Sequence, residues 1–479
     1  MLFNSLQFAI FFPVVTGIFF LLAQRWRVHW LLAASCIFYM AFIPAYILIL
    51  FVTILIDYVA GIYLEKVDDR NKKALLWVSI LSTCTVLFIF KYYDFFTGSF
   101  VGLAGLFGWH LSRHVVSIIL PIGLSFHTFQ SLSYVIEVYR GNQKAERNFV
   151  VYATYVMFFP QLVAGPIERP QNLLHQFWER HDFNYDNVTL GLKRMAWGFF
   201  KKLVVADRLA LYVNDVYSAP RSFNGLQLTI ATFFFAYQIY CDFSGYSDIA
   251  IGAAQVLGFR LMENFRTPYY SLSVSEFWRR WHISLSTWFK DYVYVPLGGN
   301  RVAHSRRVVN LLITFGVSGL WHGANWTYVV WGLLNGLYLV IGWFTKDWRD
   351  RFYCAIGLPE RSLVRKGIML STTFLLTCGA WIIFRARNMS DAVYVFTHLA
   401  SGWDFHHITT EQFWLRQMPV AIAAILLLEI GQLWSSVIPA RSFMGKMPIA
   451  ARWAIYASFV MAVLMFGVYK QMQFIYFQF

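Results

Sequence analysis

The sequence predicts an all-α integral membrane protein that crosses the bilayer many times. Of its 479 residues, 58% are hydrophobic and 19% are aromatic, whereas only 14% are charged. Soluble globular domains carry about a quarter of charged residues, so this composition indicates lipid as the main solvent. Apolar stretches of about 20 residues, enough to cross a bilayer as a helix, also recur along the whole chain. Because the polar segments between them are short, we expect one integral-membrane domain spanning residues 1–479.

The apolar stretches give the expected helices in order. They cover residues 6–23, 30–64 with a break at Pro44, 75–96, 115–138, 150–163, a weaker stretch at 190–211, 226–257, 308–344 with a break around His322, 366–384, 420–434 and 453–468. Counted by length, they correspond to roughly ten to twelve transmembrane or re-entrant helices.

Basic residues flank these stretches and predict the orientation of the first helices. The formal net charge is +15, which in a soluble protein would suggest a nucleic-acid partner. Here the basic residues are scattered through short loops, where anionic lipid headgroups and the positive-inside bias account for them. Arg25 and Arg27, the basic loop 66–73 and the loop 140–147 are therefore expected inside, with the amino terminus outside. We expect membrane lipids as partners and no nucleic acid.

The cysteines and histidines do not have the spacing of a metal or disulfide site. The five cysteines show no paired spacing, so neither a disulfide framework nor a zinc site is expected. His282 and His322 are far apart in the sequence and have no neighbouring carboxylate in a known ligand pattern. The sequence predicts neither a metal nor another cofactor.

The polar segment 271–290 is the first candidate site. Ser273 and Glu276 have the spacing of a capping box, so a helix is expected to begin here. On that helix, one apolar stripe holds Phe277, Trp281, Leu285 and Trp288, and another face holds Ser275, Arg279, His282, Ser286 and Lys290. The polar face fits the lining of a wet, positively charged cavity. It also fits an interfacial helix with aromatic anchors, and both interpretations stay open.

His322, in the middle of an apolar run, is the second candidate. Ionisable residues at membrane depth are costly and therefore functional candidates. Gly316, Gly319 and Gly323 lie at helical spacing on one side, so another helix or a ligand can approach this backbone closely. Loss of water penalises the charged imidazolium, and a neutral imidazole suits a general base, worth about 10²–10⁴ in rate. A structural role, in which the imidazole satisfies a buried carbonyl group between helices, fits the position as well.

Two acids and a histidine elsewhere are weaker candidates. Asp242 and Asp248 interrupt an apolar segment and either orient a histidine or hold two helices together, the second being the more ordinary role. His127 follows a proline and is expected to be a satisfied core histidine. Cys241 beside Asp242 has no identifiable base nearby, which argues against a thioester-forming cysteine.

Five motifs together resemble the membrane-bound O-acyltransferase family. They are residues 276–288, the turn 296–301, residues 319–325, residues 242–248 and the terminal residues 474–479. Within this family the chain looks like the bacterial alginate O-acetylation branch and is also similar to the D-alanyl-teichoic-acid transferases. The likeness spans nearly the whole chain. It departs from the pattern at His127, where an aromatic is common, and at Gln473, where a proline is frequent.

The resemblance implies tilted helices around a central cavity that is open to the cytoplasm. It implies that His322 activates the hydroxyl group that receives the acyl group, and that His282 positions the donor or assists proton movement. The implied donor substrate is acetyl-CoA. The acetyl group would pass outward through a periplasmic SGNH-type acetyltransferase partner, to a hydroxyl of an exported polysaccharide. Such a protein resides in the bacterial inner membrane.

Further roles follow from the chemistry of acyl transfer. A thioester is already activated, so the enzyme mainly has to remove a proton and stabilise the oxyanion. Asn325, close to His322, is our candidate oxyanion donor. Arg279, Arg280 and Lys290 would attract the donor's phosphates if their cavity faces the cytoplasm. Two other functions are considered: a transporter or flippase, because broken membrane helices also mark substrate pathways, and a non-catalytic channel subunit of an acetylation complex.

Overall fold

The computed structural model describes residues 1–109, 111–112, 121, 123–404, 417–437, 447–469 and 474–475. Within these ranges every regular element is a helix, which confirms the predicted all-α class. The chain divides into two compact units, residues 1–195 with 247–263 and residues 196–246 with 264–479. The boundary falls within two helices, α10 (Tyr185–Phe199) and α12 (Gly225–Val256). The expectation of one domain over residues 1–479 stays a prediction.

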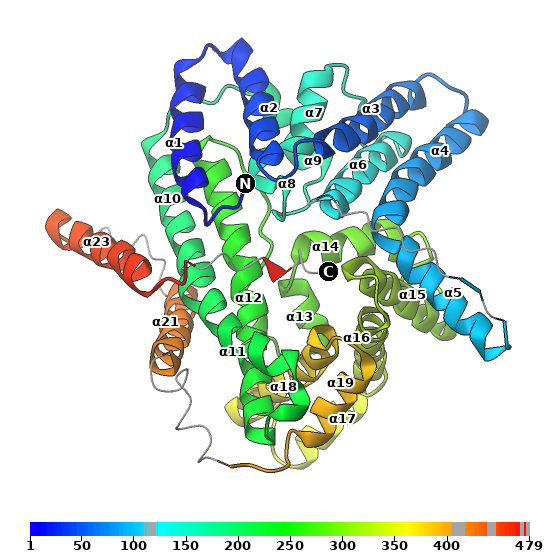
Figure 1. The fold of residues 1–479 in the computed structure, drawn as a ribbon, viewed down its shortest axis with the longest axis vertical. Coiled ribbons are helices and arrows are strands. Elements are labelled where there is room, and N and C mark those ends of the chain that lie inside the picture. Colours follow the sequence, from blue (N-terminus) through cyan, green and yellow to red (C-terminus); the bar gives the residue numbers. More distant parts are fainter. Residues whose placement is uncertain are drawn as a thin grey trace. The chain divides into compact units, whose positions relative to one another are not determined.

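Unit 1 contains the helices of the first predicted stretches (Figure 1). They are α1 (Leu6–Leu21), α2 (Gln24–Met40), α3 (Tyr46–Leu64), α4 (Asp69–Leu87), the π-helical η1 (Phe88–Tyr92), α5 (Tyr93–Leu106), α6 (Leu124–Tyr139), α7 (Phe149–Met157), α8 (Phe159–Leu162), α9 (Pro170–Leu173) and the 3-10 helix η2 (Leu174–Trp178). The predicted break at Pro44 is confirmed, because α2 ends and α3 begins on either side of it.

Unit 2 contains the helices of the later stretches. They are the π-helical η3 (Phe200–Ala206), α11 (Asp207–Ser218), η4 (Pro220–Ser222), η5 (Pro268–Tyr270), α13 (Val274–Arg280), α14 (Ile283–Phe289), the π-helical η6 (Lys290–Tyr294), α15 (His304–His322), α16 (Trp326–Phe344), α17 (Lys346–Ala355), α18 (Leu363–Arg385), α19 (Met389–His398), α21 (Met418–Val437) and α23 (Ile449–Phe466). In Figure 1, α15 and α16 lie side by side as a helical hairpin, as the sequence break around His322 predicts.

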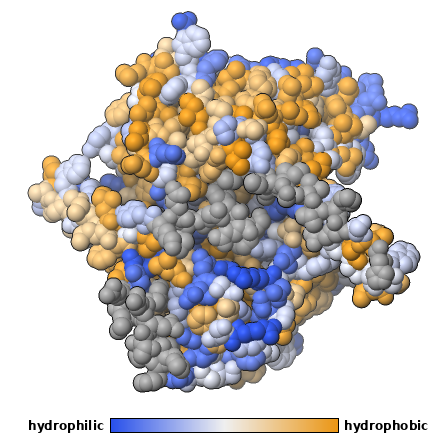
Figure 2. All heavy atoms as spheres, viewed as in Figure 1, coloured by the Kyte–Doolittle hydropathy of each residue, from blue (hydrophilic) through white to orange (hydrophobic). Residues whose placement is uncertain are grey.

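Several helices have the length and surface of membrane spans. Among the described residues, five helical segments are long and apolar enough to cross a bilayer: Tyr46–Leu64, Asp69–Leu106, Trp326–Phe344, Leu363–Arg385 and Ile449–Phe466, with shorter apolar helices at Leu6–Leu21 and Met418–Trp434. Their outer faces are hydrophobic, as Figure 2 shows around α1, where Leu6 and Leu21 are almost fully exposed. Side chains of this kind on a helix surface are suited to contact with lipid.

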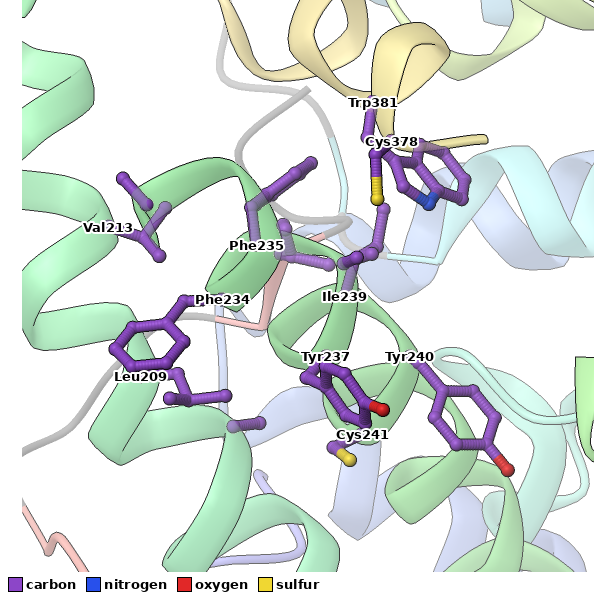
Figure 3. Packing of buried hydrophobic residues seen from close by; sticks show 14 of the residues in the cluster. Leu209, Val213, Phe234, Phe235, Tyr237, Ile239, Tyr240, Cys241, Cys378 and Trp381 are labelled. Atoms are coloured by element: carbon purple, nitrogen blue, oxygen red, sulfur yellow. The ribbon is translucent and has the colours of Figure 1, made fainter. Parts of the chain in front are cut away.

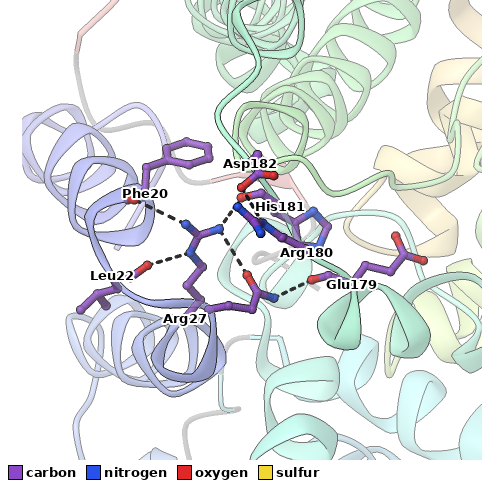
Figure 4. A network of polar contacts seen from close by, with 8 residues as sticks. Phe20, Leu22, Arg27, Glu179, Arg180, His181 and Asp182 are labelled. Atoms are coloured by element: carbon purple, nitrogen blue, oxygen red, sulfur yellow. Dashed lines mark hydrogen bonds and ion pairs between the residues drawn. The ribbon is translucent and has the colours of Figure 1, made fainter.

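Polar contacts near the protein surface fix the chain path in unit 1. Arg27, at the start of α2, donates from Nε to the carbonyl oxygen of Leu22 at 3.0 Å and from Nη1 to that of His181 (Figure 4). Gln24 adds a hydrogen bond from its amide to the carbonyl oxygen of Glu179 at 2.7 Å. These bonds tie the turn between α1 and α2 to residues 179–182.

An aromatic core holds unit 2 together. Tyr237, Tyr240 and Cys241 of α12 pack in one cluster with side chains of α11 and with Trp381 of α18 (Figure 3). Trp381 is 1% exposed, and large buried aromatic side chains contribute strongly to packing. This core is the support on which the candidate functional residues are placed.

Candidate functional site

His322 is the last residue of α15, at the closed end of the α15–α16 hairpin. Asn325 begins the next helix, because its side-chain oxygen accepts the backbone N–H of Thr327 at 3.1 Å. Such a cap satisfies a donor that the first turn of a helix otherwise leaves free. The chain therefore reverses direction within three residues of His322, and the imidazole is held where two helices meet.

Glycines allow the two helices of this hairpin to approach closely, as the sequence pattern predicts. The Cα atom of Gly332 in α16 lies 3.1 Å from where a Cβ atom on Gly319 would be. A Cβ atom on Gly323 would overlap the ring of Tyr328. The sequence left open whether another helix or a ligand approaches these glycines. The structure shows that the approaching partner is a helix.

Aromatic rings surround the His322 imidazole. The ring centroid of Trp331 lies 4.8 Å away, that of Trp321 5.0 Å away and that of Phe384 5.7 Å away, the last in an edge-on arrangement. His322 itself is only 3% exposed. A shell of this kind excludes water and penalises the charged imidazolium.

His282 lies at a break that the sequence pattern did not predict. The helix does begin at Ser273, whose hydroxyl accepts the backbone N–H of Glu276 at 3.1 Å. It does not continue to Lys290, however, because α13 ends at Arg280 and α14 begins at Ile283. His282 has φ +42 and ψ 54, a left-handed conformation that regular helix excludes.

This break separates the residues that were expected on one polar face. His282 is 1% exposed, whereas Arg279 and Lys290 are exposed. The expectation that His282 shares a wet face with these two cations is therefore wrong. The apolar stripe is confirmed, since Phe277, Trp281, Leu285 and Trp288 are all buried.

The two candidate histidines share an aromatic neighbour. The ring centroid of Trp321 lies 5.0 Å from that of His322 and 6.5 Å from that of His282. Phe243 of α12 contacts the His282 ring edge-on at 4.5 Å. The structure thus brings His282 and His322 around one tryptophan within unit 2. Sequence reasoning missed Trp321, although its place directly before His322 was a usable signal.

Asp242 holds two segments of unit 2 together, as its more ordinary interpretation predicted. Its Oδ1 accepts Lys202 Nζ at 2.6 Å and its Oδ2 accepts the backbone N–H of Ile475 at 2.8 Å. Lys202 also pairs with Asp207 at 2.8 Å, and all three ionic side chains are nearly fully buried. The missed partner is Lys202, and the signal for it was a lysine pair inside the apolar stretch 190–211. Asp248 lies in unit 1, where it pairs with Arg194.

The remaining candidate residues each contact a neighbouring residue. Arg280 forms an ion pair with Glu276 at 2.6 Å. The Asn325 amide donates to the carbonyl oxygen of Arg387 at 3.1 Å, so this nitrogen already has an acceptor. His127, in unit 1, is 1% exposed and lies 3.5 Å from the Thr53 hydroxyl, as expected of a core histidine.

Burial also sets the charge of His282, which lies outside the candidate membrane spans. Desolvation lowers the pKa of His282 to about 3. The imidazole is therefore neutral at ordinary pH and offers one donor nitrogen and one acceptor nitrogen. A neutral imidazole can accept a hydrogen bond through one ring nitrogen and donate one through the other.

Comparison with known proteins places this arrangement in a family. Residues 143–378 match the profile of the MBOAT, membrane-bound O-acyltransferase family. A probable alginate O-acetylase AlgI of Pseudomonas putida is 37% identical over 434 residues, covering 89% of this chain and 86% of the relative. A peptidoglycan O-acetyltransferase of Helicobacter pylori is 33% identical, covering 80% and 76%. A teichoic acid D-alanyltransferase of Bacillus subtilis is 25% identical, covering 56% and 69%.

The predicted site residues from Asp242 to Asn325 fall inside the matched region, and His127 lies outside it. The apolar helices fit a protein that crosses the membrane several times. With relatives above 30% identity that align over most of both chains, the protein belongs to the membrane-bound O-acyltransferase family and is a multi-pass membrane enzyme.

Proposed function

We propose that the protein moves an acetyl group from cytoplasmic acetyl-CoA across the bacterial inner membrane, toward hydroxyls of an exported polysaccharide. The names of its relatives support an acetyl group and a cell-envelope polymer, because they include alginate O-acetylases and a peptidoglycan O-acetyltransferase. A periplasmic SGNH-type acetyltransferase is the proposed partner that completes the transfer. The observation that carries the proposal is the buried His322 imidazole at the end of α15.

His322 is the proposed general base. The accepting hydroxyl oxygen attacks the thioester carbonyl carbon of acetyl-CoA while the imidazole takes the hydroxyl proton. The tetrahedral intermediate then breaks its carbon–sulfur bond, and the departing sulfur of CoA receives the proton back from the imidazole. The aromatic rings of Trp321 and Trp331 enclose the His322 imidazole. They also exclude water, which would otherwise hydrolyse the thioester.

Arg279 and Lys290 are the proposed contacts for the phosphates of the donor. Both side chains are exposed on unit 2, near the break that holds His282. Arg280 is a weaker candidate because its guanidinium is already paired with Glu276. An arginine suits this role since its planar fork matches the oxygen atoms of a phosphate group.

A variant of His322 tests the general-base proposal. Purified protein is given radiolabelled acetyl-CoA together with its SGNH-type partner, and the labelled partner or polysaccharide is measured. We expect His322→Ala to lower turnover by about 10²–10⁴. His304→Ala is the matched control, because His304 is exposed at the first residue of the same helix, and it should retain normal turnover.

The same assay separates the proposal from its rivals. Full turnover by His322→Ala would show that this residue is not the base. If the variant still supported acetylation whenever the complex assembled, the chain would be a channel subunit for a catalytic partner. Transport of an intact donor without labelled product would indicate a transporter or flippase.

A further inference from the structure

A loop that precedes α13 runs beside the break that holds His282. The backbone N–H of Ile283 donates to the carbonyl oxygen of Asn264 at 2.9 Å, and the N–H of Arg266 donates to that of Arg280 at 2.9 Å. These two bonds clamp the loop 264–266 to the residues on both sides of His282. Asn264 is 1% exposed, so its side-chain amide is held inside the protein.

The side-chain oxygen of Asn264 is a meeting point for several donors. Its Oδ1 lies 2.9 Å from Ser284 Oγ, 3.3 Å from the backbone nitrogen of Ser284 and 3.1 Å from His282 Nδ1. A backbone N–H can only donate, so the Asn264 atom that it faces must be the amide oxygen. The same oxygen faces His282 Nδ1, and an amide oxygen only accepts. Nδ1 must therefore carry the ring proton, which leaves the lone pair on Nε2.

The backbone conformation of His282 also depends on its contacts with the loop 264–266. A left-handed conformation at a residue other than glycine is unfavourable and persists only where the surroundings enforce it. Here the main-chain oxygen of Asn264 accepts the N–H of Ile283 after His282, and the N–H of Arg266 donates to the carbonyl oxygen of Arg280 before it. The same asparagine thus holds the main chain and the ring of one residue.

We propose that Asn264 is the positioning residue that fixes the tautomer and the direction of the His282 ring, so that Nε2 is its acceptor nitrogen during acyl transfer. This inference rests on the proposed function together with the role that the family resemblance implies for His282, which is to position the donor or assist proton movement. Asn264 acts only through His282, so it is not itself a catalytic residue. A neutral imidazole held in one tautomer needs no reorganisation before it accepts a hydrogen bond or a proton.

Three aromatic rings of the described residues also lie near the ring. Phe243 of α12 lies 4.5 Å from it, Phe265 of the loop 6.4 Å and Trp321 of α15 6.5 Å, as ring centroid distances. Ser284 of α14 adds a hydroxyl near Nδ1. Asn264 accepts the proton on Nδ1 directly, so substitution of Asn264 has a defined effect on the direction of the ring.

Two substitutions of Asn264 test the proposal in the acetylation assay. Asn264→Ala removes the acceptor, so we expect kcat to fall by about 10–100-fold, as for other residues that orient a functional histidine, with little change in KM. Asn264→Asp keeps an acceptor but adds a negative charge beside Nδ1, which raises the pKa of His282. Its activity should therefore be low at acidic pH and recover toward the normal value as the pH rises. A merely structural role would not produce this pH-dependent rescue.

A matched control separates positioning from loss of stability. Asn388 is exposed and caps α19 by accepting the backbone N–H of Asp391 at 2.9 Å. Asn388→Ala removes this cap, so it should lower the Tm of the protein and leave the pH profile unchanged. If Asn264→Ala behaves in the same way, with normal kcat, the positioning proposal is overturned.

A measurement on the unmodified protein tests the proposal independently of the Asn264 variants. In the full chain labelled with 15N-histidine, His282 is assigned by loss of its signals in His282→Gln, and its two nitrogens are distinguished by their shifts. A protonated Nδ1 supports the proposal, and a protonated Nε2 overturns it even if the Asn264 variants fail to fold. Normal turnover by His282→Ala would also overturn it, while the separate role of His322 would still be judged from its own variant.

Discussion

At the scale of single residues, Glu168 in unit 1 shows how burial changes a side chain. Its carboxyl group is fully buried in the loop between α8 and α9, and its Oε1 accepts the backbone N–H of Met262 at 2.5 Å. Desolvation raises the pKa of Glu168 to about 7, against an ordinary value of 4.5. The folded protein therefore keeps a proton there that the unfolded chain has already released at neutral pH.

This difference predicts how the stability of the protein depends on pH. A raised pKa stabilises the fold fully below pH 4.5, and that contribution is lost as the pH rises through 7. Glu168→Gln removes the titration and keeps an acceptor for Met262, so we expect it to raise the free energy of unfolding at pH 8 by on the order of 2 kcal/mol. At pH 4.5 the variant should be nearly equal to the normal protein. Thermal unfolding of the purified protein in detergent at both values measures this.

The control for this prediction is Glu179→Gln. The Glu179 side chain is exposed and lies in the same unit, so its removal should change the Tm little at either pH. Equal shifts for the two variants at pH 8 would contradict the explanation by burial.

At the scale of elements, the sequence predicts helices better than it predicts how they break. Apolar stretches gave the helices of both units, and the capping pair Ser273 and Glu276 gave the start of α13. These signals are local. The break at His282 is accompanied by hydrogen bonds that Asn264, a residue outside the helical pattern, accepts, so periodicity alone extended the helix through it.

The same reason explains which site residues the sequence identified. His322 was identifiable because an ionisable residue inside an apolar run is costly. The partner of Asp242 was not, because Lys202 reaches it from another helix and no periodicity relates the two. The sequence thus identifies residues whose chemistry is unusual for their position. Which of these residues pair with one another can be read only from the folded structure.

The α15–α16 hairpin carries a prediction at this scale. Gly319→Ala would push its Cβ atom into the carbonyl oxygen of Tyr328, so the two helices must separate. Because His322 follows one turn later, we expect turnover to fall at least about 10-fold and stability to fall by about 1–3 kcal/mol, the usual cost of overpacking. The acetylation assay and thermal unfolding measure the two effects.

Gly342→Ala is the matched control on the same hairpin. A Cβ atom at Gly342 meets no other atom within 4 Å, and alanine favours helix more than glycine does. This variant should keep normal turnover with equal or slightly higher stability. If Gly319→Ala behaves like Gly342→Ala, close helix contact is not what holds His322 in place.

At the scale of the whole molecule, His282, His322 and the proposed donor-binding residues belong to unit 2, and unit 1 supplies several of the apolar helices. The net charge is +15, and in unit 1 basic residues lie in the loops and at the starts of helices, such as Arg25 and Arg27 of α2. In unit 1 these basic loops predict which side of the membrane each helix end faces. The helix α3 offers the most direct test, because its 19 residues form one of the candidate spans.

Single cysteines at the two ends of α3 test this orientation. In a variant lacking the five native cysteines, Ala45→Cys lies in the exposed turn before α3 and Asn71→Cys lies in the exposed basic segment after it. The positive-inside bias places Asn71 in the cytoplasm and Ala45 outside. A membrane-impermeant maleimide should therefore label Ala45→Cys in spheroplasts, and Asn71→Cys only after the membrane is opened. Labelling of Asn71→Cys in sealed spheroplasts would reverse the predicted orientation, and equal labelling of both would mean that α3 does not span the bilayer.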